Sequence, residues 1–166
     1  MIRILGIDPG SRVTGFGIID SDGINATHVA HGTLRLKGRE LPSRLGQIFA
    51  EISEVIESYR PEVMAVEQVF VSKNPSSALK LGHARGAAIC AGVSRGLAVA
   101  EYAPRSIKKA VVGTGSAEKE QVQHMVKLIL KLAESPQEDA ADALAVALSH
   151  ANTNTMLGRL AAGRTR

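Results

Sequence analysis

The sequence has few of the residues that cross-link or anchor small proteins. It holds one cysteine (Cys90), no tryptophan, two tyrosines and three phenylalanines. A single cysteine excludes an internal disulfide and a cysteine-rich zinc site, and it favours a reducing, cytoplasmic setting. The five histidines are scattered without the spacing of metal ligands. The N-terminal apolar run is too short for a signal peptide, and charge or glycine interrupts the longer ones, which excludes a transmembrane helix.

The length and composition are those of one globular domain. The chain has 166 residues, of which 45% are hydrophobic and 22% are charged. This length supports a core that folds without covalent staples. We predict one domain over 1–151 and a flexible basic tail over 152–166, because the tail has three arginines and few apolar residues.

Hydrophobic periodicity predicts an α/β fold. Apolar or alternating runs bounded by turn residues predict strands over 2–7, 14–19, 24–36, 63–66 and 97–102. Three- and four-residue spacings, capping residues and prolines predict helices over 41–60, 76–95, 104–112, 116–132 and 138–151. The first three strands form an antiparallel meander, and a crossover helix returns the chain to the sheet. We therefore expect a five-stranded mixed sheet flanked by helices.

Positive charge is concentrated in one segment. The chain carries a net charge of +4, but residues 68–109 alone hold seven basic residues against one acidic residue, a net charge of +6. Such a block is the footprint of a protein that binds a polyanion. The structural alternative is a solvated basic face. The block contains Lys73, Lys80, Arg85 and Lys108, which are candidate contacts for such a polyanion.

Two carboxylates stand at the ends of apolar strands. Asp8 follows Ile-Arg-Ile-Leu-Gly-Ile, and Glu67 follows Val-Met-Ala-Val. Glutamate is depleted in strands, so its position calls for an explanation. Asp8 could close an Asx turn with Gly10, and Glu67 could reach solvent at the end of its strand. The functional alternative is a shared acidic site.

Two further carboxylates, Asp139 and Asp142, share one face of the last predicted helix, because they lie three residues apart. We assign the capping of this helix to Ser135 and Glu138, which leaves both aspartates without a capping role. Asp139 could interact with the helix dipole. Asp142 lies in an alanine- and leucine-rich run, where an uncompensated carboxylate is costly.

A divalent cation would compensate these four acids. Oxygen ligands without histidine or cysteine favour Mg²⁺ or Mn²⁺. A pair of such ions stabilises both the attacking and the leaving oxygen in phosphoryl transfer. Carboxylates beside a basic block therefore indicate metal-dependent chemistry on a phosphate backbone.

Two other features have both structural and functional interpretations. Phe70 lies directly after the Glu67 strand, where it either anchors a loop in the core or stacks on an unpaired base. Small residues recur at every fourth position in the second predicted helix, which indicates close packing against either the chain's own sheet or a second copy. The stripe comprises Ala78, Gly82, Gly86, Cys90 and Ser94. By residue type, Cys90 is expected to be a small core residue rather than a reactive thiol.

These motifs, in this order, resemble the RuvC family of Holliday-junction endonucleases from Ile2 to about His150. The resemblance rests on Gly6-Ile7-Asp8-Pro9-Gly10-Ser11, Val66-Glu67-Gln68-Val69-Phe70, Ser77-Ala78-Leu79-Lys80-Leu81-Gly82, Gly115-Ser116-Ala117-Glu118-Lys119 and Glu138-Asp139-Ala140-Ala141-Asp142. It implies a ribonuclease-H-like fold and a homodimer. With a dimer, the small-residue stripe would supply the two-fold interface, along Ala78, Gly82, Gly86 and Cys90.

The resemblance also implies residue roles. Asp8, Glu67, Asp139 and Asp142 match the family's catalytic acids, which would hold two Mg²⁺ ions per subunit, with Mn²⁺ able to substitute. Phe70 matches an aromatic residue that stacks on DNA, and Lys108 and Lys119 match lysines near the scissile phosphate. The implied activity is resolution of four-way junctions by paired symmetric nicks, with 5′-phosphate and 3′-hydroxyl ends. The implied partner is the RuvA–RuvB branch-migration complex.

Two other functions are compatible with parts of the sequence. Asp8-Pro9-Gly10 also occurs in actin-like ATPases, but those enzymes enclose the nucleotide between two such domains, and 166 residues supply one. A junction-binding protein without catalytic activity would not need all four acids.

Overall fold

The computed structural model describes the backbone of residues 1–70 and 74–163 and the side chains of these residues up to 153. The strands are β1 (Ile2–Asp8), β2 (Val13–Ser21), β3 (Ala26–Arg35), β4 (Val63–Glu67) and β5 (Ala98–Tyr102). The helices are α1 (Leu41–Tyr59), α2 (Pro75–Ser94), α3 (Pro104–Val112), α4 (Lys119–Ile129) and α5 (Glu138–Gly163).

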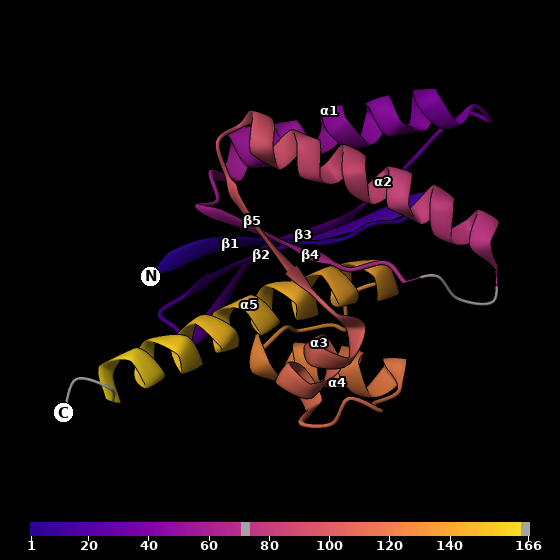
Figure 1. Ribbon diagram of the computed structural model, residues 1–166. Helices are drawn as coiled ribbons and strands as arrows, with labels where there is room; N and C mark the ends of the chain where they lie inside the picture. The colour runs from indigo at the N-terminus through magenta and orange to yellow at the C-terminus, as the bar shows by residue number, and fades with distance from the viewer. Residues whose placement is uncertain (71–73, 164–166) are drawn as a thin grey trace.

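The five strands form one mixed sheet in the order β3-β2-β1-β4-β5. The strands β1, β2 and β3 pair antiparallel, while β4 pairs parallel with β1 and with β5. Helices α1 and α2 cover one face, and α3, α4 and α5 cover the other (Figure 1). The predicted α/β class with a five-stranded mixed sheet is confirmed.

The central strands are buried on both faces, which explains why they read as apolar runs without alternation. In β1, Leu5 and Ile7 pack in the core beneath α1 and α2, whereas Ile4 packs in the core beneath α5. Because strand side chains alternate between faces, Asp8 shares the face of Ile4. The same alternation in β4 puts Glu67 on the face of Ala65, which also packs in the α5 core. Both strand-end carboxylates therefore face α5.

Helix α5 lies directly on β1 and β2 because the strands present glycine to it. A Cβ on Gly6 would collide with the carbonyl oxygen of Ala143, and one on Gly15 would collide with that of Asp139. A Cβ on Gly17 would approach the side chain of Leu144 to 2.7 Å. Buried alanines on the helix complete this close contact. The distance between α5 and the sheet therefore depends on these glycines.

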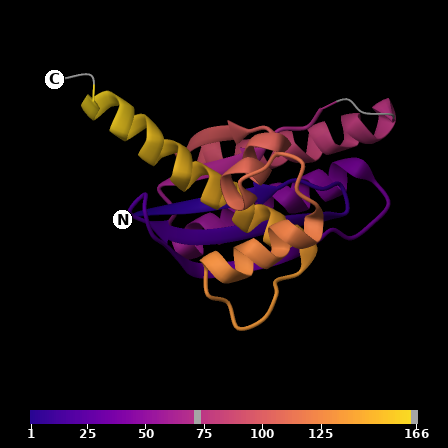
Figure 2. The same cartoon turned by 90° about the horizontal axis from the view of Figure 1, so that it is seen from below.

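Three predicted helix boundaries are wrong. The N-cap of α4 is Glu118 rather than Ser116, and the side chain of Gln121 accepts a hydrogen bond from the Glu118 N–H at 2.8 Å. Helix α4 also ends at Ile129 rather than near residue 132. Helix α5 begins at Glu138, as predicted. The helix also continues past residue 151 to Gly163, and its last turns extend beyond the sheet (Figure 2). The division into a domain and a flexible tail stays a prediction.

No helix within the described part of the chain combines the length and apolar character needed to cross a bilayer.

We expect Gly15→Ala to destabilise the fold by roughly 1–3 kcal/mol, because the new methyl group overpacks the contact between β2 and α5. Urea unfolding measures the effect. Gly46→Ala is the matched control, since Gly46 lies on the exposed side of α1 with open space around its Cα. That variant should be unchanged or more stable by up to about 1 kcal/mol. Equal effects of the two substitutions would contradict the close packing of α5.

Candidate active site

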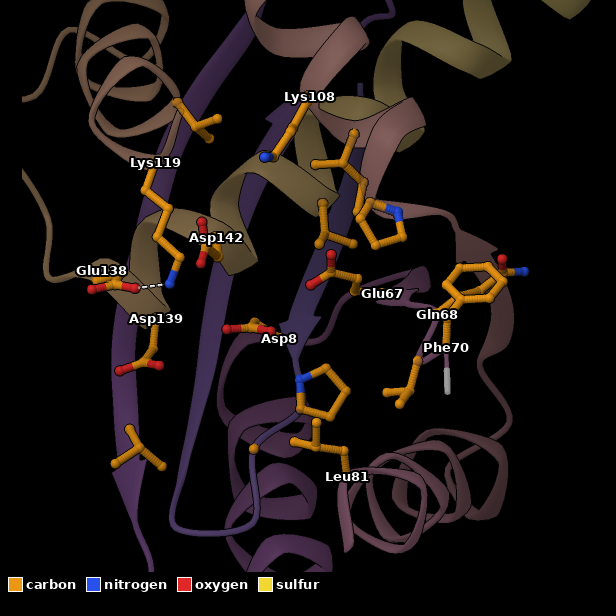
Figure 3. Close-up of a pocket in the computed structure, with 18 residues that line it drawn as sticks. Asp8, Glu67, Gln68, Phe70, Leu81, Lys108, Lys119, Glu138, Asp139 and Asp142 are labelled. Carbon is orange, nitrogen blue, oxygen red and sulfur yellow. Dashed lines mark hydrogen bonds and ion pairs between the residues drawn. The ribbon is translucent and has the colours of Figure 1, made fainter. Parts of the chain in front are cut away.

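The carboxyl ends of β1 and β4 bring Asp8 and Glu67 together. The two strands are parallel neighbours, with Ile7 opposite Val66, so the next residue of each strand lies at the same edge of the sheet. Both side chains point toward α5, as their alternation requires (Figure 3). Two residues that are far apart in the sequence thus form one half of an acidic site.

The first turns of α5 supply the other half. Asp139 and Asp142 lie three residues apart and face the same cavity as Asp8 and Glu67 (Figure 3). The cavity has a volume of about 460 Å³. The structure therefore brings together all four carboxylates that were predicted to act as a site.

Two lysines line the same cavity from other elements. Lys108 comes from α3, and Lys119 is the first residue of α4. Lys119 forms an ion pair with Glu138, the first residue of α5. The cavity thus combines a carboxylate cluster with cationic groups at its margin, an arrangement suited to a phosphodiester that is held by metal ions.

The structural roles considered for Asp8 and Glu138 are not realised. The N–H of Gly10 donates to the hydroxyl of Thr14 at 3.2 Å, and that hydroxyl donates to the Gly10 carbonyl at 2.9 Å. Thr14 therefore closes the turn that Asp8 was considered to close. The predicted capping box with Ser135 is also wrong, because α5 begins at Glu138 and Ser135 therefore lies before the N-cap position. The carboxylate of Glu138 accepts a hydrogen bond from Lys119 instead.

Comparison with known proteins identifies the family. The family model described as crossover junction endodeoxyribonuclease RuvC matches residues 4–150. The chain belongs to the RuvC family. It is 57% identical over 162 residues to the crossover junction endodeoxyribonuclease RuvC of Pectobacterium atrosepticum, covering 98% of this chain and 95% of the relative.

Solved structures agree with this assignment. Thermus thermophilus RuvC in complex with a Holliday junction substrate is 36% identical, with a TM-score of 0.87 and coverage of 94% of this chain and 96% of that chain. The yeast mitochondrial Holliday junction resolvase Ydc2 has a TM-score of 0.68 at 12% identity, covering 98% of this chain and 84% of that chain. At that identity, the second match supports the fold alone. The predicted ribonuclease-H-like class is confirmed by the RuvC match.

In this RuvC-family chain, burial and mutual repulsion disfavour ionisation of the clustered acids. Burial raises the pKa of Asp8 to about 8, and the charges of Glu67 and Asp142 push it in the same direction. Burial also raises the pKa of Asp142 to about 6, although Lys119 opposes the rise. Burial and the charge of Asp142 raise the pKa of Glu67. The site therefore holds more negative charge than its own lysines compensate.

The donor set fits a hard divalent cation, on which RuvC-family nucleases generally depend. The four side chains offer carboxylate oxygens, and a bound cation would offset the burial and repulsion that raise the pKa values of Asp8 and Asp142. They surround a cavity rather than one point: within the described ranges, no three Asp, Glu, His or Cys side chains are close enough to hold an ion as they stand. Mg²⁺ commonly binds through one or two carboxylates and completes its coordination with water, so such a cavity can accommodate it.

The other predicted DNA-binding residues are distributed differently. Phe70 lines the cavity and is 60% exposed, so it does not anchor its loop in the core. Lys80 is exposed on α2, outside the cavity. Arg85 forms an ion pair with Glu101 and also lies outside the cavity lining. Lys73 falls outside the described residues.

The small-residue stripe of α2 faces outward. A Cβ on Gly82 or Gly86 would meet nothing within 4 Å, whereas Ala84 and Ala88 are buried against the rest of the chain. The alternative in which the stripe packs on the chain's own sheet is therefore wrong. The expectation that Cys90 is a core residue is also wrong, because its side chain is exposed.

Sequence reasoning missed the position of three residues. Glu138 lines the cavity, where an acid beside a predicted catalytic aspartate could have been considered as a partner for Lys119. Leu79 and Val93 are 66% and 59% exposed on α2. They lie 14 residues apart, four helical turns, so a helical projection would have placed them on one face with Gly86.

We expect the cation-free protein to lose stability as pH rises from 5 to 8. Folded Asp8 keeps its proton up to its raised pKa of about 8, whereas the unfolded chain releases it near pH 3.8. The unfolding free energy therefore falls with rising pH, by at most about 1.4 kcal/mol per pH unit for one such group. Urea unfolding in EDTA measures the slope.

Asp8→Asn should flatten this pH dependence and stabilise the cation-free protein at pH 8. Glu54→Gln removes one charge from an exposed position of α1 and should keep the wild-type slope. If Asp8→Asn and Glu54→Gln have the same slope, the pKa of Asp8 is not raised in the folded protein.

Proposed function

We propose that this chain is a structure-specific endonuclease that resolves Holliday junctions in recombination and repair by paired, symmetric nicks. The observation that carries the proposal is the cavity itself, where four carboxylates from β1, β4 and α5 face two lysines. Membership of the RuvC family supplies the substrate class. A family member from Thermus thermophilus has been solved with a Holliday junction substrate.

The catalytic residues of this proposal are Asp8, Glu67, Asp139 and Asp142, which would hold two Mg²⁺ ions per subunit. When bound, such ions activate water as the nucleophile and stabilise the leaving 3′-oxygen, leaving 5′-phosphate and 3′-hydroxyl ends. Asp8 would be central to this set of ligands, because β1 is the central strand and the other three acids surround it. Cation binding would also remove the repulsion that keeps these acids partly protonated.

The lysines and Phe70 would hold the DNA. Lys108 and Lys119 reach the margin of the cavity from separate helices, where they can contact the phosphates that flank the cleaved bond. Phe70 is exposed at the same cavity and can stack on a base that the junction leaves unpaired. The basic block 68–109 adds sequence-independent attraction to the phosphate backbone.

A second copy of this chain would cover the outward face of α2. The face presents Leu79, Gly82, Gly86, Cys90 and Val93, which are small or apolar. Two such helices can approach closely across a two-fold axis because glycine leaves no side chain between them. A dimer also supplies the two active sites that paired nicks require. Leu79 and Val93 thereby extend the interface predicted along Ala78, Gly82, Gly86 and Cys90.

Family membership also supports a partner and a location. The RuvA–RuvB branch-migration complex would deliver junctions to this nuclease, and cytoplasmic DNA would be its substrate. Neither proposal rests on a particular surface of this chain.

Incubation with a synthetic four-way junction and a linear duplex, in Mg²⁺ or EDTA, tests the activity. We expect nicking of the junction alone and only in Mg²⁺. Asp8→Asn should bind the junction but nick it on the order of a thousandfold more slowly, because it loses a ligand worth several kcal/mol in the transition state. Glu54→Gln should nick normally.

Equal cutting of junction and duplex would contradict structure specificity. Persistent nicking by Asp8→Asn would show that the metal site is assigned to the wrong residues.

Gly82→Glu tests the dimer. The new side chain has open space in the monomer, so folding should be retained, but it places two carboxylates against each other across the proposed two-fold axis. We expect sedimentation to show monomers and the paired nicks to become single, unpaired ones. Gly46→Glu adds the same charge at another exposed helical glycine and should leave the dimer intact. A dimer that persists in Gly82→Glu would place the interface elsewhere.

A further inference from the structure

The two lysines of the cavity differ in their surroundings. Lys119 forms an ion pair with Glu138, whereas Lys108 forms none among the residues that the structure describes. In Figure 3 the ammonium group of Lys119 turns toward Glu138, at the side of the cavity away from Glu67. One of the two cationic groups is therefore neutralised within the chain before DNA arrives.

The fold does not need this pair. The side chains of Lys119 and Glu138 are 66% and 54% exposed, and ion pairs that are this exposed contribute little to stability. Other contacts secure the start of α5. Gln123 donates to the Pro136 carbonyl at 2.9 Å, and Thr33 donates to the Gln137 side chain at 3.1 Å.

The position of the pair suggests competition with DNA. Lys119 begins α4 and Glu138 begins α5, so their side chains meet beside Asp139 and Asp142. A phosphate near these acids would lie within reach of the same ammonium group. Because both side chains are long and exposed, the pair can open without a change in the backbone.

We propose that Glu138 is a positioning residue that holds the charge of Lys119 until a DNA phosphate displaces it. This inference rests on the proposed nuclease function of the cavity. The consequence is selectivity for DNA that places a phosphate in the cavity. Such a phosphate can displace Glu138 and bind Lys119, whereas DNA bound without a phosphate in the cavity makes no contact with this lysine. Linear duplex would bind less tightly for that reason.

The salt dependence of binding separates this role from a structural one. A free lysine that contacts a phosphate releases a counterion, which steepens the plot of log K against log salt by about 0.9. In the wild type, Lys119 leaves the carboxylate of Glu138 when it binds a phosphate of the DNA. Because one ion pair replaces another, Lys119 contributes little to the slope. In Glu138→Gln, each Lys119 should steepen the slope by about 0.9.

Fluorescence anisotropy in EDTA, between 50 and 200 mM salt (roughly the range over which such slopes are measured), tests this with junction and duplex DNA. We expect Glu138→Gln to have the steeper slope, to bind duplex roughly two- to fivefold more tightly at low salt, and to keep the wild-type melting temperature. Lys119→Gln should change the slope little in the wild type but abolish the added slope in the Glu138→Gln background. Lys108→Gln, the matched control, should flatten the slope in both backgrounds.

Equal salt slopes for Glu138→Gln and the wild type, with both folded, would overturn the proposal. An added slope that survives Lys119→Gln would assign the effect to another cation and would overturn it as well. Nicking by the wild type distinguishes failure of this proposal from failure of the proposed function. If junctions are cut but the slopes are equal, only the role of Glu138 is wrong. If no junction is cut in Mg²⁺, the proposed function is wrong.

Discussion

The structure depends on the close contact between α5 and the central strands. The glycines of β1 and β2 remove the side chains that would otherwise hold the helix away, and the alanines of α5 do the same from the other side. Interiors pack densely, so a single methyl group at this contact shifts a rigid element. The depth of α5 in turn decides how near Asp139 and Asp142 lie to Asp8. The same contact thus builds the core and sets the dimensions of the site.

Packing brings the four carboxylates together, although their negative charges repel one another. Four carboxylates share one cavity, and burial and repulsion raise the pKa values of three of them. Two lysines stand at the margin, and one of these already has an acidic partner. This imbalance explains how one surface can suit both a cation and a polyanion: the acids attract divalent ions, and the surrounding basic segment attracts phosphates.

Features that depend on local sequence patterns could be predicted from the sequence. Apolar strands that end in Asp8 and Glu67, and an aspartate within an alanine-rich helix, are visible without a structure, and so were the sheet and the four acids. Predictions failed where the role of a residue depends on a partner that is distant in the sequence. Glu138 satisfies a capping pattern, but its partner Lys119 belongs to another helix. Small residues occur on both faces of α2, so sequence alone could not tell that Ala84 faces inward and Cys90 outward.

The distribution of the acids along the chain also governs when the site can exist. Asp8 belongs to the first strand and Glu67 to the fourth, whereas Asp139 and Asp142 belong to the last helix. During synthesis from the N-terminus, a chain that ends before α5 carries only half of the carboxylates, and it lacks the helix that packs directly on β1 and β2. An incomplete translation product therefore cannot assemble the cavity. The four acids come together only after α5 has been made and has packed on the sheet.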